Sequence, residues 1–307
     1  MYTLIARNEH ILHNGLNMFL FTRIVSLHPP ICQTTDPERV IGRGSVEQNR
    51  PFVSDKDNTV DILGIPVHCG EPSEVRALID KRIIQRLPTR IAFLNAHLSN
   101  IAARDRDLQE QLQSFLVLND GIGIDLARRI LHGRPFERNL NGTDFLPYLL
   151  ETTEHNLRVF LLGARKHVVT EAAAVISTRW PRHRIVGLRD GYFDKRNEPD
   201  IQNEIRRADP DLVLVGMGNP RQEAWIASNI PSVCSCALAI GAGFDFLSGT
   251  IPRAPGWIRR MRLEWLYRLC REPVRLGRRY LVGNIVFLVR VALERFRTQH
   301  NKGLLRQ

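Results

Sequence analysis

Residues 208–227 read ADPDLVLVGMGNPRQEAWIA, and this stretch decides the fold class. Its LVLV run is continuously apolar, which is typical of a strand buried on both faces of a parallel sheet. A glycine turn follows, and then a helix start with Asn219 as the predicted N-cap, Pro220 at the first helical position and Gln222 at the third. The stretch therefore predicts a buried strand, a tight turn and a helix, which together are part of a βαβ unit.

The same alternation of apolar runs and amphipathic stretches continues on both sides. Predicted strands lie at 61–67, 90–94, 115–118, 157–162, 184–188, 211–217 and 234–240. Predicted helices lie at 74–87, 98–112, 122–131, 168–179, 201–208 and 221–227. Short strands that alternate with helices predict an α/β fold, with a mainly parallel, Rossmann-like sheet flanked by helices. Ligands on such sheets bind beyond the carboxyl ends of the strands, so those junctions are the candidate sites.

Composition divides the chain into three segments. Residues 1–58 mix polar stretches and prolines without a sustained period, which predicts a poorly ordered or loosely packed extension. Residues 59–251 carry the α/β pattern, and residues 252–307 are predicted to form an Arg-rich, amphipathic helical appendage. From residue 251 onward there are 14 Arg and Lys against 3 Asp and Glu, so the whole formal net charge of +11 lies in this tail.

The cysteines and the hydropathy of the chain indicate in which cellular compartment the protein is expected. The chain has 5 cysteines and no C-x-x-C pair, which fits a reducing cytosol and gives no zinc or redox motif. No apolar run reaches the roughly 18–20 residues that a membrane-spanning helix needs, and no signal peptide is evident. A spanning protein and a disulfide-rich secreted protein are therefore not expected.

The first candidate junction is LNDGIG, residues 118–123, where Asp120 follows a buried strand and precedes two glycines. A carboxylate in this place is suited to act as general base on a substrate hydroxyl. An acid at a strand end also caps helices and binds riboses, so the residues alone leave both roles open.

Two further junctions offer sites for a nucleotide. Gly218, Asn219 and Gln222 stand at a predicted helix start, which is an anion site suited to a diphosphate. Gly243 and Asp245 lie in the glycine turn after the next predicted strand. The third glycine of a dinucleotide-binding fingerprint is absent after residue 218, so the pattern favours a nucleotide crevice but not NAD in particular.

Charge neutralisation at such a crevice needs cations. Arg138, which precedes a predicted helix start at Asn141, is a candidate for steadying phosphate oxygens. Three Asp-x-Asp pairs have the spacing of a metal-holding motif, but none follows an apolar strand; they lie at 55–57, 105–107 and 209–211. We therefore expect no metal and no cofactor, with arginines or a helix dipole stabilising a departing diphosphate.

The tail combines arginines with leucines and aromatic residues. Its candidate lipid-diphosphate and membrane-binding residues are Arg253, Arg268, Arg271, Arg275 and Arg278. Trp257, Trp265 and Tyr267 favour a lipid interface, and Pro273 must end or bend one helix. The combination predicts a segment that lies on an anionic membrane surface, whose apolar faces favour self-association into a homo-oligomer when no membrane is present. A nucleic-acid patch and a helical pair packed on the main domain are the alternatives.

Eight motifs are distributed along residues 59–281. They are LNAHLSNIA (94–102), LNDGIGIDLARR (118–129), NGTDFL (141–146), VFLLGARKHV (159–168), GYF (191–193), ADPDLVLVGMGNPRQEAWIA (208–227), AIGAGFDFLSGTIPRAP (239–255) and LEWLYRLCREPVRLGRRYL (263–281). In this combination the chain resembles the WecG/TagA/CpsF family of bacterial glycosyltransferases, glycosyltransferase family 26.

The resemblance implies an inverting transfer of a sugar from a UDP-sugar to a polyprenyl-diphosphate-linked saccharide, for a bacterial surface polysaccharide or exopolysaccharide. It implies a peripheral location on the cytoplasmic face of the inner membrane. It places the general base at Asp120 and site roles at Asn95, Arg138 and Gln222. It assigns the Arg-rich tail to membrane docking and to completing the active site.

Two positions depart from the family pattern. Phe93 stands where the family usually has Thr, and Asn119 stands where it usually has Pro. The first departure suggests a donor other than the N-acetylmannosamine that some members use, with glucose or a uronic acid as candidates.

Two other classes of protein share parts of the pattern. A nucleotide-dependent oxidoreductase would need the complete glycine fingerprint with an acid about 20 residues further on, which the chain lacks. A basic nucleic-acid-binding protein would use the tail for steeply salt-dependent binding. Because Leu and Trp are abundant among the tail arginines, the sequence favours a membrane over nucleic acid as the binding partner of the tail.

Overall fold

The computed structural model describes residues 58–261 and 263–304. The predicted N-terminal extension at 1–58 lies outside the described residues, except for Asn58.

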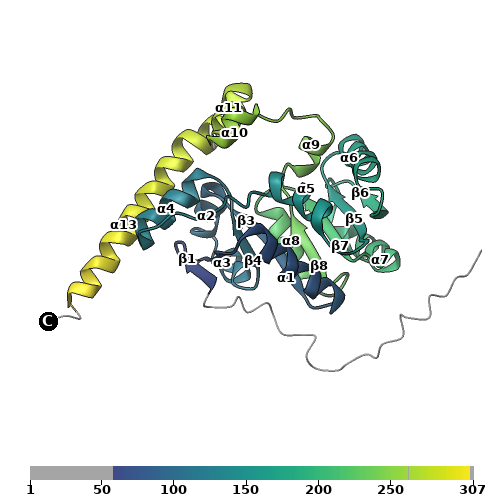
Figure 1. The fold of residues 1–307 in the computed structure, drawn as a ribbon, viewed down its shortest axis with the longest axis horizontal. Coiled ribbons are helices and arrows are strands. Elements are labelled where there is room, and N and C mark those ends of the chain that lie inside the picture. Colours follow the sequence, from purple (N-terminus) through teal and green to yellow (C-terminus); the bar gives the residue numbers. More distant parts are fainter. Residues whose placement is uncertain (1–57, 262, 305–307) are drawn as a thin grey trace, which may run out of the picture. The chain divides into compact units, whose positions relative to one another are not determined.

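Six strands form one sheet in which each neighbouring pair is parallel (Figure 1). In spatial order they are β4 (Leu116–Asn119), β3 (Thr89–Leu94), β8 (Cys236–Ala239), β7 (Leu212–Gly216), β5 (Arg158–Gly163) and β6 (Arg184–Arg189). The predicted α/β class with a mainly parallel, Rossmann-like sheet is confirmed.

Helices cover both faces of this sheet. Successive side chains of a strand point to opposite faces, so a continuously apolar strand makes both faces apolar and both must be buried. In β7, Leu212 and Leu214 join the apolar cluster on one face, whereas Val213 and Val215 join the cluster on the other. The first face packs against α1 (Pro72–Ile84), α5 (Gly142–Thr152) and α6 (Lys166–Arg179). The second packs against α2 (Ala96–Ala102), α3 (Arg106–Leu112), α4 (Ile122–His132), α7 (Glu198–Ala208) and α8 (Arg221–Asn229).

Three predicted elements differ from the structure. The single strand expected at 61–67 is an antiparallel pair, β1 (Thr59–Asp61) and β2 (Pro66–His68). The chain turns back at Leu63 and Gly64, which have φ of 56° and 85°, and Asp61 accepts a hydrogen bond from the Gly64 N–H. The helix expected at 98–112 is two helices, because Asp105 caps the start of α3 by accepting from the Leu108 N–H.

The helix start at 219–222 is the third difference. Helix α8 begins at Arg221 with Pro220 as its N-cap, so Gln222 is the second helical residue and not the third. Asn219 does not cap the helix; its amide nitrogen donates to Glu223 Oε1 at 2.8 Å. This local change decides which atoms of the turn remain open to a ligand.

The described tail residues form helices and no strand, as predicted. They are α10 (Gly256–Arg260), α11 (Glu264–Arg271), α12 (Pro273–Gly277), a π-helical turn (Arg278–Val282) and α13 (Gly283–Leu304), and the short α9 (Gly243–Leu247) precedes them. Pro273 ends one helix and opens the next, as expected. Within residues 58–261 and 263–304, no helix has both the length and the apolar character that crossing a bilayer requires.

Helix α13 packs on the α/β domain along α2 and α4 (Figure 1). Phe287 and Val291 are 1% and 0% exposed and belong to the main apolar cluster. Polar contacts fix the helix in register, because the Asn100 amide donates to the Gly283 carbonyl at 2.7 Å and Arg290 donates to the Ser99 carbonyl at 3.0 Å. The tail is therefore in part a packed layer of the domain.

Truncation of Phe287 measures that packing. Phe287→Ala is expected to lower the free energy of unfolding by about 3–5 kcal/mol, since it removes a buried ring and leaves a cavity. The matched control is Phe296→Ala, the same change on the same helix at a ring that is 69% exposed, with an expected effect within about 0.5 kcal/mol. Equal effects of the two variants in denaturant unfolding would contradict the packed position of α13.

Candidate active site at the carboxyl ends of the strands

A cavity of about 480 Å³ lies at the carboxyl ends of four adjacent strands, β4, β3, β8 and β7. Of the sequence-predicted site residues, it is lined by Asn95, Asp120, Asn219, Gln222 and Arg268. These residues come from loops far apart in the chain, and the parallel sheet brings them together because the ends of its strands share one edge. The tail contributes a wall of the same cavity through α11, the π-helical turn and α13.

Asp120 is the first residue after β4. Its backbone N–H donates to the Leu94 carbonyl at 2.8 Å, which extends the pairing with β3 by one step. Gly121 then adopts φ of 89°, a left-handed conformation that favours glycine, and its N–H donates to Asn139 Oδ1 at 2.9 Å. The turn holds the Asp120 carboxylate at the cavity while the chain enters α4.

Asn95 orients the Asp120 carboxylate from β3. Asn95 Oδ1 accepts from the Leu98 N–H and so caps α2, which leaves the amide NH₂ to donate to Asp120 Oδ2 at 3.3 Å. Burial raises the pKa of Asp120, while the hydrogen bond from Asn95 and the charge of Arg279 act in the opposite direction. The result is a carboxylate that is more basic than usual and faces a cavity, which is the requirement for a general base.

Gln222 ties two strand-end loops together. Its Oε1 accepts from the Gly218 N–H at 3.1 Å, after β7, and from the Gly241 N–H at 3.0 Å, after β8. The Gln222 backbone N–H is itself taken by the Gly218 carbonyl at 3.1 Å. These bonds occupy the Gly218 and Gln222 N–H groups, two of those that an anion at the helix start would use, so an anionic ligand needs further positive charge.

The tail provides that charge. Arg268, from α11, and Arg279, from the π-helical turn, both line the cavity, as does Trp265. The Nε atoms of both arginines and the Trp265 indole nitrogen are buried and have no hydrogen-bond partner among the described residues. Burial lowers the pKa of Arg279, an effect that nearby Asp120 partly offsets, but an arginine stays charged at neutral pH. Two guanidinium groups on one wall suit an anionic ligand rich in oxygen atoms.

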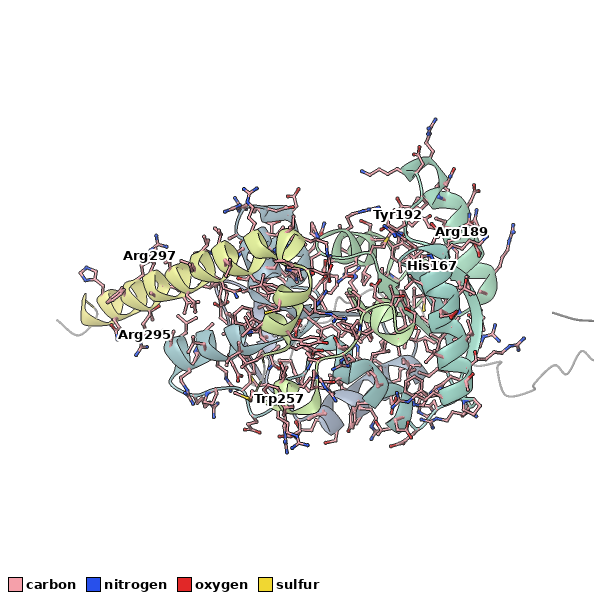
Figure 2. All side chains as sticks on the ribbon, turned by 90° about the horizontal axis from the view of Figure 1, so that it is seen from above. His167, Arg189, Tyr192, Trp257, Arg295 and Arg297 are labelled. Atoms are coloured by element: carbon pink, nitrogen blue, oxygen red, sulfur yellow. The ribbon has the colours of Figure 1, made fainter. Side chains whose placement is uncertain are left out.

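The other four tail arginines predicted as site residues lie outside the cavity lining. Arg253 donates to Asp144 at 2.6 Å and to Glu264 at 3.1 Å, which fastens the tail to the start of α5. Arg275 pairs with Glu272, and Arg271 and Arg278 are exposed. Figure 2 shows two further tail side chains at the outside of the molecule, Trp257 on α10 and Arg297 toward the end of α13.

Four other predicted residues also lie outside the cavity lining. Arg138 forms an ion pair with Glu71 at 3.5 Å, and its carbonyl accepts from the Asn119 amide. Gly218 supplies the N–H that Gln222 accepts. Gly243 and Asp245 lie in α9, where burial raises the pKa of Asp245 against the charges of Arg268 and Arg275.

Two residues that the sequence did not single out for catalysis line the cavity beside Asn95. Burial, with the charge of Arg279, lowers the pKa of His97 to about 4, so its imidazole is neutral at neutral pH. Phe93 is 6% exposed and stacks edge-to-face on Phe145, with ring centroids 6.2 Å apart. The departure noted in the sequence thus falls on the cavity wall. In the described part of the chain, His, Cys, Asp and Glu form no group of three that could hold a metal ion.

A family model confirms the resemblance. The model of the glycosyl transferase WecG/TagA/CpsF family matches residues 60–301. The chain belongs to this family. It is therefore a glycosyltransferase, and the oxidoreductase and nucleic-acid alternatives have no comparable support.

Curated relatives in this family carry a common description. The chain is 35% identical, over 72% of its length and 86% of the relative's, to an N-acetylglucosaminyldiphosphoundecaprenol N-acetyl-beta-D-mannosaminyltransferase of Bacillus subtilis strain 168. A protein of the same description from Bacillus spizizenii is 33% identical over 56% of this chain and 67% of its own. One from Staphylococcus aureus strain MW2 is 28% identical over 78% of this chain and 95% of its own length. Family membership thus covers the cavity and the tail that closes it.

Proposed function

We propose that the chain transfers a sugar from a UDP-sugar to a polyprenyl-diphosphate-linked saccharide, with inversion at the anomeric carbon. The observation that carries this proposal is the convergence of the Asp120 carboxylate with the Arg268 and Arg279 side chains on one cavity. A carboxylate base and a cationic wall are the two groups that glycosyl transfer from a nucleotide diphosphate needs. The relatives described as acting on a diphosphoundecaprenol acceptor support the lipid-linked acceptor.

In the proposed reaction, Asp120 takes the proton from the acceptor hydroxyl as its oxygen attacks the anomeric carbon. The bond from that carbon to the UDP oxygen breaks on the opposite face, so the sugar inverts and the electron pair leaves with UDP. The Arg268 and Arg279 guanidiniums, on the wall of the same cavity, neutralise the diphosphate as its charge develops. These donors are already in place, so little reorganisation is needed in the transition state.

One residue of the cavity wall bears on the choice of donor sugar. Phe93 presents an aromatic ring, packed against Phe145, where a hydroxyl-bearing side chain is usual in the family. A ring in this place removes a hydrogen-bonding partner for a substituent of the sugar. The relatives described as N-acetyl-beta-D-mannosaminyltransferases support UDP-N-acetylmannosamine as a donor, and Phe93 adds UDP-glucose and UDP-uronic acids as candidates.

The exposed side of α13 is proposed to dock on the anionic cytoplasmic surface of the inner membrane, where exopolysaccharide precursors on polyprenyl diphosphate are extended. Large exposed apolar side chains recur along α13 at helical spacing, namely Ile285, Val289, Leu293 and Phe296, and Leu281 precedes them in the π-helical turn. Arg278 and Arg297 are exposed beside them. An apolar stripe flanked by cations suits the interface between lipid headgroups and chains.

Introduction of a negative charge on this apolar stripe tests the docking. Ile285→Glu and Phe296→Glu are each expected to weaken binding to anionic vesicles at least about tenfold, because each removes a side chain that is transferred out of water and adds a repelled charge. Ile84→Glu is the control: Ile84 is an equally exposed isoleucine, on α1. Vesicle sedimentation that responds alike to all three variants, or to none, would contradict docking through α13.

A nucleotide-release screen tests the proposed reaction. The full chain is incubated with a panel of UDP-sugars and polyprenyl-diphosphate-linked acceptors, with and without EDTA, and free UDP is measured. Acceptor-dependent release of UDP that EDTA leaves unchanged is expected, because arginines neutralise the leaving group in this proposal. Loss of activity in EDTA would point to metal-assisted departure, and absence of release with every donor would overturn the UDP-sugar assignment.

A further inference from the structure

Glu223 is a buried acid directly beneath the cavity. Its side chain is 0% exposed, and its Oε1 accepts from Asn219 Nδ2 and from Gln222 Nε2, each at 2.8 Å. Its Oε2 is also buried and has no hydrogen-bond partner in the described part of the chain. Burial raises the pKa of Glu223 to about 7, which shows how poorly the charge is solvated there. A core position that served packing alone would be more stable with an apolar residue.

The two donors to Glu223 are the two cavity-lining amides of the β7–α8 turn. Gln222 must keep its Oε1 toward the Gly218 and Gly241 N–H groups, so its NH₂ needs an acceptor on the other side. Glu223 is that acceptor. The same carboxylate oxygen binds the NH₂ of Asn219, and this leaves Asn219 Oδ1 without a hydrogen-bond partner among the described residues.

The position of this turn on the sheet indicates which part of the substrate it meets. Asp120, where the sugar and the acceptor hydroxyl must come together, follows β4, whereas Asn219 follows β7, with β3 and β8 between them. A donor with its anomeric carbon near Asp120 therefore extends its nucleoside diphosphate along the strand ends toward Asn219. Uracil and ribose carry N–H and O–H groups, and an amide oxygen accepts from either.

We propose that Glu223 is a positioning residue for the nucleotide: it sets the amide orientations of Gln222 and Asn219, so that Asn219 Oδ1 faces the cavity as an acceptor for an N–H or O–H of the UDP moiety. This inference rests on the proposed function in one respect, namely that the donor is a UDP-sugar. It adds a buried residue that does not touch the substrate but controls which atom does.

Two substitutions separate orientation from charge and from packing. Glu223→Met fills the space but offers no acceptor, and we expect the Kd for UDP and the KM for the donor to rise about tenfold, with kcat within about threefold of wild type. Glu223→Gln keeps an amide oxygen that accepts from both neighbours, and it should restore the Kd to within about threefold. Glu223→Met removes a poorly solvated charge but leaves the buried Gln222 NH₂ without an acceptor, so its Tm is expected to stay at or somewhat below that of wild type.

Asp80 supplies the matched control. It is a 4% exposed acid on α1 that accepts from Thr153 and pairs with Arg76 away from the cavity lining. Asp80→Asn should lower Tm and leave the Kd for UDP unchanged. Calorimetric titration of UDP into each full-length variant, with thermal unfolding of the same samples, gives both readouts.

The outcomes are distinct. A wild-type Kd in Glu223→Met, or a loss of Tm in that variant without a change in Kd, would show a structural role and overturn the inference alone. If the folded wild-type chain does not bind UDP, the proposed donor class fails, and the inference fails with it. A raised Kd in Glu223→Met that Glu223→Gln does not restore would also overturn it, since charge rather than amide orientation would then govern binding.

Discussion

Asp120→Asn is expected to lower kcat by about 10²–10⁴-fold, because the amide cannot accept the proton of the attacking hydroxyl. The substitution is nearly isosteric. The carboxylate plays no part in the hydrogen bond from the Asp120 N–H to the Leu94 carbonyl or in that from the Gly121 N–H to Asn139. The fold and the affinity for UDP should therefore stay close to wild type. Single-turnover measurement of UDP release, beside UDP titration, separates the chemical step from binding.

Asp144 is the control for this variant, because it lines the same cavity and carries the same group. Burial alone would raise the pKa of Asp144, but hydrogen bonds from Asn141 and Arg253 lower it overall, so it is a weaker base than Asp120. Asp144→Asn should reduce kcat by less than about tenfold. If the two variants lost activity equally, or if Asp120→Asn kept near-wild-type turnover, Asp120 would not be the base.

The same carboxylate sets the expected response to acid. Burial raises the pKa of Asp120 above its ordinary value of 3.8, and only the deprotonated form accepts the proton. Activity should therefore decline with falling pH at a higher pH than an unperturbed aspartate would give. In Asn95→Ala the bond that favours the carboxylate is lost, so this acidic limb should move further upward.

Arg268→Ala and Arg279→Ala are expected to lower kcat/KM by about 10²–10³-fold each, since each removes a preorganised donor at the departing diphosphate. Arg→Lys at either position should recover part of the loss, because a lysine restores the charge but not the planar fork of the guanidinium. Initial rates with saturating acceptor and varied donor provide the comparison.

Arg271→Ala is the matched change on the same segment. Arg271 is exposed on α11, outside the cavity lining, and lies over the Tyr267 ring at 5.9 Å. Its removal should change kcat/KM less than about threefold, as expected for a solvated surface charge. A uniform loss across the three arginines would mean that the tail acts through its net charge and not through two placed side chains.

Much of this architecture could be predicted from the sequence. Strands buried on both faces require unbroken apolar runs, and LVLVG in β7 and VFLLG in β5 are such runs. Once the sheet is parallel, residues that directly follow its strands must meet at one edge. Asp120, Asn95 and Gln222 could therefore be expected in one cavity, and the structure brings them there.

The contribution of Arg279 could not be predicted. A regular helix through the tail would space its side chains at 3.6 residues per turn, and the sequence steps then favour Arg275 and Arg278. The π-helical turn at Arg278–Val282 adds a residue to the turn and rotates the following positions, which places Arg279 at the cavity. Nothing in the local residue pattern marks such a change of helical phase.

Glu223 and Arg138 illustrate a second reason why parts of the site could not be predicted from the sequence: their environment depends on residues that the local motif does not contain. An acid in the first turn of a helix is favoured whether it faces water or the core, so the motif alone does not reveal that Glu223 is buried. Arg138 was a reasonable phosphate ligand by its place in the chain. Glu71, which precedes α1 and is distant in sequence, holds it at 3.5 Å outside the cavity lining.

The π-helical turn joins the cavity wall to the helix whose outer side we propose as the membrane contact. The turn and α13 are one continuous helix, so any tilt or shift of α13 would also move Arg279. Attachment to the bilayer and delivery of this guanidinium would then be one mechanical event. An enzyme free in solution would then hold the proposed UDP-sugar more loosely, and hydrolysis of that donor away from the lipid-linked acceptor would be slow.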